Sequence, residues 1–180
     1  MRALLAGGCA LQLLAPQGGG LQVFKAWLDR EHPGYVSDEG PARFRNAIVA
    51  AAYPGRRFYY VLTYPRGIGI ARNALTLVAQ IDDHGSVLPL DLRSPATYRP
   101  GLRRVVTARD ARSAATAVLI LALGDPAQRR WKFEENQVTV ERNKDGWLCT
   151  YSYGANYVSR VRFDNHGTLT EIDPRLPPVA

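Results

Sequence analysis

Two short stretches contain residue types that could hold a metal ion. Acidic or amide residues precede a histidine and a glycine in both: Asp82, Asp83, His84 and Gly85, then Asp164, Asn165, His166 and Gly167. Imidazole and carboxylate groups suit divalent ions, but a metal site needs several converging ligands, and neither stretch has a third or fourth at metal-site spacing. We therefore predict no metal and no cofactor. Both stretches are interpreted as hairpin turns, because Asp and Asn bond their own backbone and Gly supplies a positive φ.

Cys149 is a candidate nucleophile. An activated thiolate needs a nearby base and partial exposure, whereas Cys149 lies among aromatic residues in a segment typical of a strand, where a small buried thiol is the simpler interpretation. The glycines at 18–20 and 67–69 do not precede a helix with phosphate-loop spacing. We predict that the protein has no catalytic residues and is not an enzyme.

The two turns belong to a longer repeat. The stretch 81–87 returns 82 positions later as 163–169, and Asp91 and Asp173 follow at the same spacing. With about seven residues added to the first loop, the strand candidate 58–64 aligns with 147–153, which pairs Phe58 with Trp147. The repeat predicts two copies of one structural unit.

The spacing of apolar residues predicts the elements that position these turns. Helical spacing predicts helices over 23–31, 44–51 and 107–122, and Thr107 with Asp110 forms a capping pair for the third. A period of two predicts strands at 58–64, 75–81, 87–90, 138–142, 147–153, 157–163 and 169–172. We predict an α+β fold made of two repeats, each with helix and antiparallel meander.

Composition shifts divide the chain into five parts. We predict a leader at 1–20, a first α+β repeat at 21–93, a linker at 94–101, a second α+β repeat at 102–173 and a tail at 174–180. The proposed linker is rich in proline and glycine, which mark loops.

The leader resembles a short secretory signal. Met1 and Arg2 precede an uncharged stretch from Ala3 to Ala15 and then three glycines. The segment from Ala6 to Cys9 also resembles the lipobox of bacterial lipoproteins, which would make Cys9 the lipidated residue. A periplasmic, secreted or lipid-anchored location and a cytoplasmic one stay equally open. No later segment has the 18 or more apolar residues of a membrane helix.

The net charge of +7 would suit an anionic partner, but its distribution disfavours nucleic acid. Twenty of the 23 basic residues are arginines, and they are scattered in pairs without a recognisable nucleic-acid module. We predict that the partner is another protein.

Strand alternation predicts where this partner binds. If Trp147, Cys149, Tyr151, Val161 and Phe163 face the helix, the opposite face carries Leu148, Thr150, Ser152, Val158, Arg160 and Arg162. In the first repeat we assign Tyr59, Val61, Thr63, Thr76, Val78 and Gln80 to the corresponding face. These faces are either a contact site or the place where the two sheets pack together. The candidate contact residues are Leu148, Thr150, Val158, Arg160, Arg162 and Tyr59.

One segment resembles known families. A helix, a strand that begins Asp-Gly-Trp and a strand that closes in Phe-Asp-Asn-His-Gly-Thr-Leu-Thr cover 107–173. This pattern resembles the repeats of PepSY-like and cystatin-like families. It is also similar to two-repeat β-lactamase inhibitor proteins and to NTF2-like immunity proteins of toxin systems. The resemblance implies a non-catalytic bacterial module that binds another protein, as an inhibitor or immunity protein for an enzyme or toxin.

A second interpretation stays open beside the first. An NTF2-like shape would make the protein a small-ligand binder or an enzyme, in which helix and curved sheet enclose an apolar pocket around Tyr151, Tyr153 and Tyr157.

Overall fold

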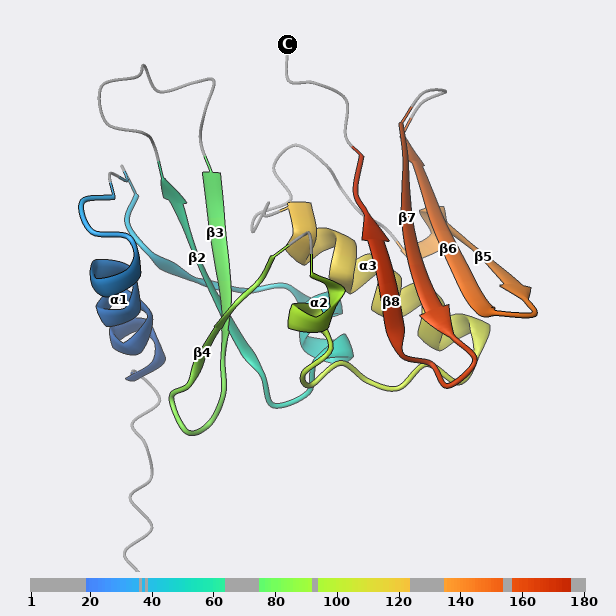
Figure 1. Cartoon of the computed structure of the whole chain (residues 1–180), viewed down its shortest axis with the longest axis horizontal. Coiled ribbons are helices and arrows are strands. Elements are labelled where there is room, and N and C mark those ends of the chain that lie inside the picture. The colour runs from blue at the N-terminus through green and yellow to red at the C-terminus, as the bar shows by residue number, and fades with distance from the viewer. Residues whose placement is uncertain are drawn as a thin grey trace, which may run out of the picture.

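The computed structural model describes residues 19–35, 37, 39–63, 75–91, 94–123, 135–153 and 157–175 of the 180-residue chain. That part contains three α-helices and two four-stranded antiparallel sheets (Figure 1), so the protein is α+β, as predicted. The predictions made for residues 1–18, including Cys9, and for 176–180 lie outside the described residues. No described helix is long and apolar enough to cross a membrane.

The first unit has two helices and one sheet. Its elements are α1 (Gly19–Glu31), β1 (Ala42–Phe44), α2 (Ala47–Ala52), β2 (Arg57–Thr63), β3 (Leu75–Ile81) and β4 (Val87–Pro89). The sheet has the order β1-β2-β3-β4, with every neighbouring pair antiparallel.

The second unit has one long helix ahead of its sheet. Its elements are the 3-10 helices η1 (Pro95–Tyr98) and η2 (Glu135–Gln137), helix α3 (Ala108–Leu123) and the strands β5 (Val138–Asn143), β6 (Gly146–Tyr153), β7 (Tyr157–Asp164) and β8 (Leu169–Asp173). The sheet order β5-β6-β7-β8 is again a meander. The predicted strands are therefore all present, to within one or two residues.

The helix predicted from Phe44 begins three residues later than expected. Phe44 instead ends β1 and pairs with Phe58 of β2, where its side chain is buried. Asn46 then caps α2, because its Oδ1 accepts hydrogen bonds from the N–H groups of Ile48 and Val49 at 2.9 and 3.1 Å. Strand pairing with β2, a contact between distant parts of the sequence, decides the conformation of Phe44.

Helix α3 begins at the predicted capping pair. The Thr107 N–H and hydroxyl both donate to Asp110 Oδ2 at 2.8 Å, and the Asp110 N–H donates to Thr107 Oγ1 at 3.2 Å. This reciprocal arrangement satisfies N–H groups that have no partner within the helix. The helix then runs almost wholly buried, with Ala111 and all residues from Ala114 to Leu121 in the core.

The elements stack in four layers (Figure 1): α1, the first sheet, α2 with α3, and the second sheet. Phe24 and Leu28 of α1 pack on Tyr59, Val61 and Ala79 in a core of their own. A larger core joins the opposite face of the first sheet to α2, α3 and the inner face of the second sheet. Because α3 has neighbours on two sides, it is apolar nearly all round rather than along one stripe.

One residue of the predicted linker, Tyr98, is part of the larger core. Tyr98 of η1 is 2% exposed, and its carbonyl accepts a 2.9 Å hydrogen bond from the Tyr53 hydroxyl. The Arg103 N–H donates to the carbonyl of Ala52 at 2.9 Å. On the other side, Arg99 Nε donates to the carbonyl of Leu169 in β8 at 2.8 Å, so the segment 94–101 contacts both units.

Candidate functional site

The second sheet has an inner and an outer face, as alternation predicted. Cys149, Tyr151, Val161 and Phe163 are each at most 4% exposed and lie in the core shared with α3. The side chains at the intervening positions point away from α3. We call these the outer face, made of Leu148, Thr150, Ser152, Val158, Arg160 and Arg162. Among the described helices, α3 packs on the inner face of this sheet, and the 3-10 helix η1 contacts its edge strand β8.

The outer face carries charges of both signs. Arg162 Nε lies 2.7 Å from Glu171 Oε2, and Arg160 Nη1 lies 3.9 Å from Asp173 Oδ2. These are cross-strand neighbours of β7 and β8. The four side chains are between 32% and 48% exposed, so solvent screens the attraction and each pair stabilises the fold little. Arg162 Nε has no well-aligned hydrogen bond despite the short distance, so this pair is held by charge attraction.

Trp147 does not belong to the outer face. It packs against the shared core, and the guanidinium of Arg142 lies 4.9 Å from the centre of its ring. This contact is a cation–π interaction at the rim of the inner face.

The two sheets correspond residue by residue, but the correspondence in β2 and β6 is shifted by one residue from the alignment read from the sequence. Arg57 pairs with Ile81 at the end of the first hairpin, and Trp147 pairs with Phe163 at the same place in the second. Arg57, and not Phe58, is therefore the counterpart of Trp147. A slip of one residue moves every side chain of a strand to the other face.

This slip corrects the face assigned in the first repeat. Tyr59 and Val61 share a face with Ala79, whereas Val78 and Gln80 lie on the opposite one. Tyr59 is 2% exposed, and its ring centre lies 5.9 Å from that of Phe24 on α1. Tyr59 is thus covered by α1 and does not line an open face.

The face of the first sheet that corresponds to the outer face is covered. Phe58, Tyr60 and Val78 are the counterparts of Leu148, Thr150 and Arg160, and they pack into the core with α2 and α3. The corresponding positions are therefore apolar where helices cover them and mixed or charged on the outer face. Both sheets are four-stranded meanders. They differ in that helices cover this face in the first sheet, and no described helix covers it in the second.

The repeated stretches are two copies of one turn. Asp82 Oδ1 accepts hydrogen bonds from the N–H groups of His84 and Ser86, both at 2.9 Å. Asp164 Oδ1 accepts from His166 and Thr168, both at 2.8 Å. These hydrogen bonds lower the pKa of both carboxyl groups.

The other residues of the turns complete this structure. Gly85 and Gly167 adopt φ values of +81° and +77°. Asp83 Oδ1 lies 3.4 Å from Arg57 Nη2, and Asn165 Nδ2 donates to the Lys144 carbonyl at 2.7 Å. His84 and His166 are exposed at the ends of different sheets. Within the described residues no three His, Cys, Asp or Glu side chains gather where they could hold a metal.

Cys149 is poorly suited to nucleophilic chemistry. It is 1% exposed, and its Sγ lies 3.5 Å from the carbonyl oxygen of Ala111, to which it donates. Burial raises the pKa of the thiol to about 12, so the thiolate is scarce at neutral pH.

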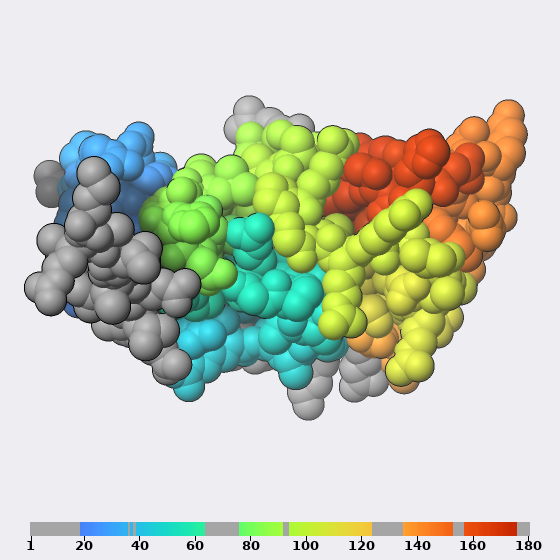
Figure 2. All heavy atoms as spheres, turned by 90° about the horizontal axis from the view of Figure 1, so that it is seen from below, coloured from blue at the N-terminus to red at the C-terminus, as the bar shows by residue number. Residues whose placement is uncertain are grey.

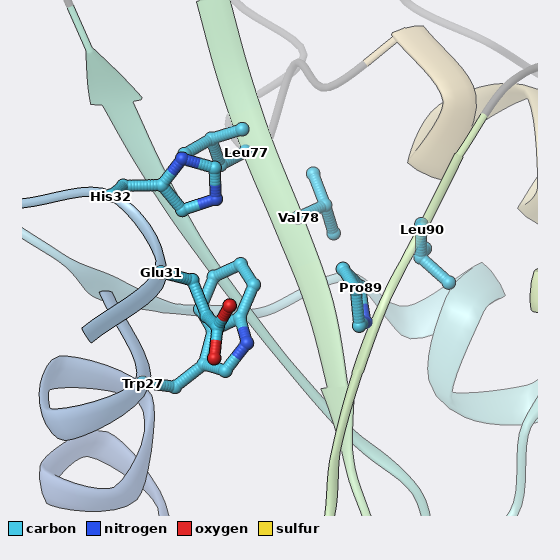
Figure 3. A pocket seen from close by; sticks show the side chains of 7 residues that line it. All are labelled: Trp27, Glu31, His32, Leu77, Val78, Pro89 and Leu90. Carbon is cyan, nitrogen blue, oxygen red and sulfur yellow. The ribbon is translucent and has the colours of Figure 1, made fainter. Parts of the chain in front are cut away.

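A groove that the sequence did not reveal lies in the first unit (Figure 3), between the end of α1 and the strands β3 and β4. Its volume is about 380 Å³, and its lining consists of Trp27, Glu31, His32, Leu77, Val78, Pro89 and Leu90. The rings of Trp27 and His32 meet edge to face with centres 5.2 Å apart. The groove joins residues far apart in the sequence, so local patterns could not have indicated it.

The fold and its outer face define the class to which this chain belongs: an α+β protein of two stacked helix-and-sheet units with one sheet face uncovered by any described helix. Comparison with known proteins found no matching family model, no matching curated protein and no matching solved structure.

Proposed function

We propose that the protein binds another protein through the outer face of the second sheet and has no catalytic activity of its own. In this proposal it acts as an inhibitor or immunity protein, of the kind that the PepSY-like and cystatin-like resemblance implies, on an enzyme or toxin.

The observation that carries the proposal is the difference between the two sheets. In the first unit α2 and α3 cover Phe58, Tyr60 and Val78. The corresponding face in the second unit has half-buried Leu148 and Thr150 on β6 and half-buried Val158 near the start of β7, and the described part of the chain places no helix over them. In the first unit, helices pack on the corresponding face. We therefore expect the partner to place a helix on the outer face of the second sheet.

The charge pattern supports the same interpretation. Arg160 and Arg162 stand where the covered sheet has Val78 and Gln80, and their ion pairs with Asp173 and Glu171 keep the face soluble without a partner. Carboxylates on a helix of the partner could replace Asp173 and Glu171 as the ion-pair partners of the two arginines at little cost in free energy, because the existing pairs are exposed and weak. Binding should therefore weaken only moderately as salt rises.

The proposal is tested by capturing partners from an extract of the native host on the immobilised protein. We compare the wild type with Thr150→Arg, which places a bulky charge in the middle of the face, and with Val158→Arg, which places one near the start of β7. Gln22→Arg is the matched control, because it adds the same charge at an exposed position of α1. All variants are first shown to unfold at the same urea concentration as the wild type.

The proposal predicts one protein that the wild type and Gln22→Arg retain and that both face variants lose. With the purified partner, each face variant should weaken binding at least tenfold, since a central charge disrupts desolvated contacts. Equal capture by all four proteins would refute the outer face as the binding site. Loss in every variant, the Gln22→Arg control included, would show that capture responds to added charge anywhere on the protein, and it would also refute the outer face as the binding site.

The alternative function, a small-ligand binder with a pocket around Tyr151, Tyr153 and Tyr157, has less support. Tyr151 is 4% exposed and packs in the shared core. The side chain of Tyr153 lies outside the described residues. The groove in Figure 3 is in the other unit, beside α1.

A further inference from the structure

A strip of exposed arginines runs from the end of η1 into the first turn of α3. Residues 99–109 contain four arginines and no acidic residue. We call the four the basic strip: Arg99, Arg103, Arg104 and Arg109, all of which are exposed. Figure 2 shows this segment, in yellow-green, on the surface between the first unit and the second sheet.

The β7–β8 hairpin holds two of these arginines in place. Arg99 Nε donates to the Leu169 carbonyl at 2.8 Å, and Arg104 Nε donates to the His166 carbonyl at 3.1 Å. His166 and Leu169 are three residues apart, so their backbones lie within about 11 Å of each other. Each bond uses one of the five N–H groups of a guanidinium. The described residues accept no hydrogen bond from the Nη groups of either arginine, so these groups stay available.

The basic strip has no carboxylate paired with it. Within the described residues none of its four arginines forms an ion pair, whereas Arg160 and Arg162 on the outer face each have one. The two carboxylates nearest along the chain or in the hairpin are engaged elsewhere. Asp110 caps α3, and Asp164 accepts the N–H groups of its own turn. The positive charge of the strip is therefore directed at solvent.

The guanidinium group favours a particular class of ligand. Its two Nη groups form a planar fork that matches the two oxygens of a carboxylate or phosphate. Because the Nε bonds already fix Arg99 and Arg104, less side-chain entropy is lost when a ligand binds. Proteins that bind single-stranded nucleic acid add exposed aromatic side chains, but the aromatic residue beside the strip, Tyr98, is 2% exposed, and the exposed side chain within it is the aliphatic Val106, at 65%. A protein segment that carries carboxylates fits this combination better than nucleic acid does.

We propose that the basic strip binds an acidic segment of another protein. Its carboxylates pair with the Nη groups of Arg99 and Arg104, and an apolar side chain beside them contacts Val106. An extended segment advances about 3.3 Å per residue, so acidic residues two or three positions apart match the spacing of the two anchored arginines. The strip shares no residue with the outer face of the second sheet, and the proposal does not rest on the function of that face.

The test measures how the full chain binds a fluorescein-labelled eight-residue peptide of alternating Glu and Ala, by anisotropy at about 150 mM salt. The matched peptide has Gln in place of Glu. Replacing Arg99 and Arg104 together by Gln removes the anchored forks, and replacing both by Lys keeps the charge but not the fork. The control replaces Lys25 and Arg30 of α1 by Gln, which removes the same charge from the first unit.

A second pair keeps the test valid if the loss of the two Nε bonds lowers stability. Arg103→Gln with Arg109→Gln removes the same charge from the strip, and neither side chain makes a hydrogen bond to the described residues. We expect this double variant to weaken binding of the Glu peptide severalfold and to unfold at the same urea concentration as the wild type.

The wild type should bind the Glu peptide and not the Gln peptide. The Gln replacement at Arg99 and Arg104 should weaken binding roughly tenfold, the Lys replacement should restore only part of it, and the α1 control should leave it unchanged. The proposal is overturned if the Glu peptide is not bound, if the α1 control weakens binding as much as either strip variant, or if the Lys variant or the Arg103 and Arg109 variant binds as tightly as the wild type. Phosphatidylserine vesicles and single-stranded DNA are titrated in parallel. Tighter binding of either one, lost in the same strip variants, would assign the strip to a membrane or to nucleic acid and overturn an acidic protein segment as its ligand.

Discussion

The repeat offers a stability experiment with an internal control, the replacement of Gly85 or Gly167 by alanine. Both glycines occupy the same place in the same turn, with φ values of +81° and +77°. A side chain at such a φ costs roughly 1–2 kcal/mol, because the left-handed region crowds the Cβ against the backbone. This cost is common to both substitutions.

The surroundings of the two glycines differ. A Cβ on Gly85 would meet only Val23 Cγ2, at 3.9 Å, which is an ordinary contact. A Cβ on Gly167 would collide with the carbonyl oxygen of Val105, a backbone atom in the segment that leads into α3. Forcing atoms into a packed site costs typically about 1–3 kcal/mol. We therefore expect Gly85→Ala to lower the free energy of unfolding by roughly 1–2 kcal/mol and Gly167→Ala by roughly 2–5 kcal/mol.

Urea denaturation followed by tryptophan fluorescence measures both losses. The slope of the unfolding free energy against urea should match the wild type, so that a shift of the midpoint reports stability alone. Gly85→Asn separates the two causes further, because Asn tolerates the left-handed region better than Ala and should recover part of the loss. Equal losses for Gly85→Ala and Gly167→Ala would refute the close packing of the second turn against Val105.

Three further predictions concern the helix cap, the turn carboxylates and the buried thiol. Thr107→Ala should lower the free energy of unfolding by about 1 kcal/mol in urea titrations, because the reciprocal bonds with Asp110 are lost, whereas Thr107→Ser should retain most of it. Asp82 and Asp164 have folded-state pKa values lowered by backbone hydrogen bonds, so they stabilise the fold above the unfolded carboxyl pKa of about 4 and lose this effect as the pH falls through the folded pKa. The double variant with Asn at both positions should show a shallower fall in Tm between about pH 5 and pH 2 than the wild type, and an unchanged acid profile would contradict the assigned cause. In a Cys9→Ser variant, which leaves Cys149 as the one cysteine of the sequence, the native protein should resist a thiol reagent at neutral pH and react fully in about 6 M guanidinium chloride, since burial raises the pKa of Cys149 to about 12; rapid native labelling of this variant would show that the inner face opens.

Local patterns were enough to predict most elements. The alternation of β6 and β7 separated Cys149 and Tyr151 from Leu148 and Thr150, and the structure has the same division. Thr107 and Asp110 marked the start of α3, because capping depends on residues three positions apart. The turn residues likewise follow from chemistry within five residues.

Features that depend on distant contacts were missed or misplaced. Apolar spacing places Phe44 in a helix, because spacing cannot distinguish a helix from a strand that pairs with β2. The repeat alignment read from the sequence differs by one residue from the structure, and it places Tyr59 on an open face because a slip of one residue moves every side chain of a strand to the other face. The groove beside α1 joins residues from Trp27 to Leu90, and no local pattern indicates it.

The sequence by itself determined the α+β class, the two meanders, the capped helix and the repeated turns, because each depends on neighbours along the chain. The tertiary structure alone decided which faces are covered. It stacked α3 between the two sheets, used the segment around Tyr98 as part of the core and left the outer face of the second sheet without a described helix over it. Whether a helix covers a sheet face depends on the order in which helices and sheets stack. That order depends on long-range packing, which the alternation and spacing of residues along the chain do not encode.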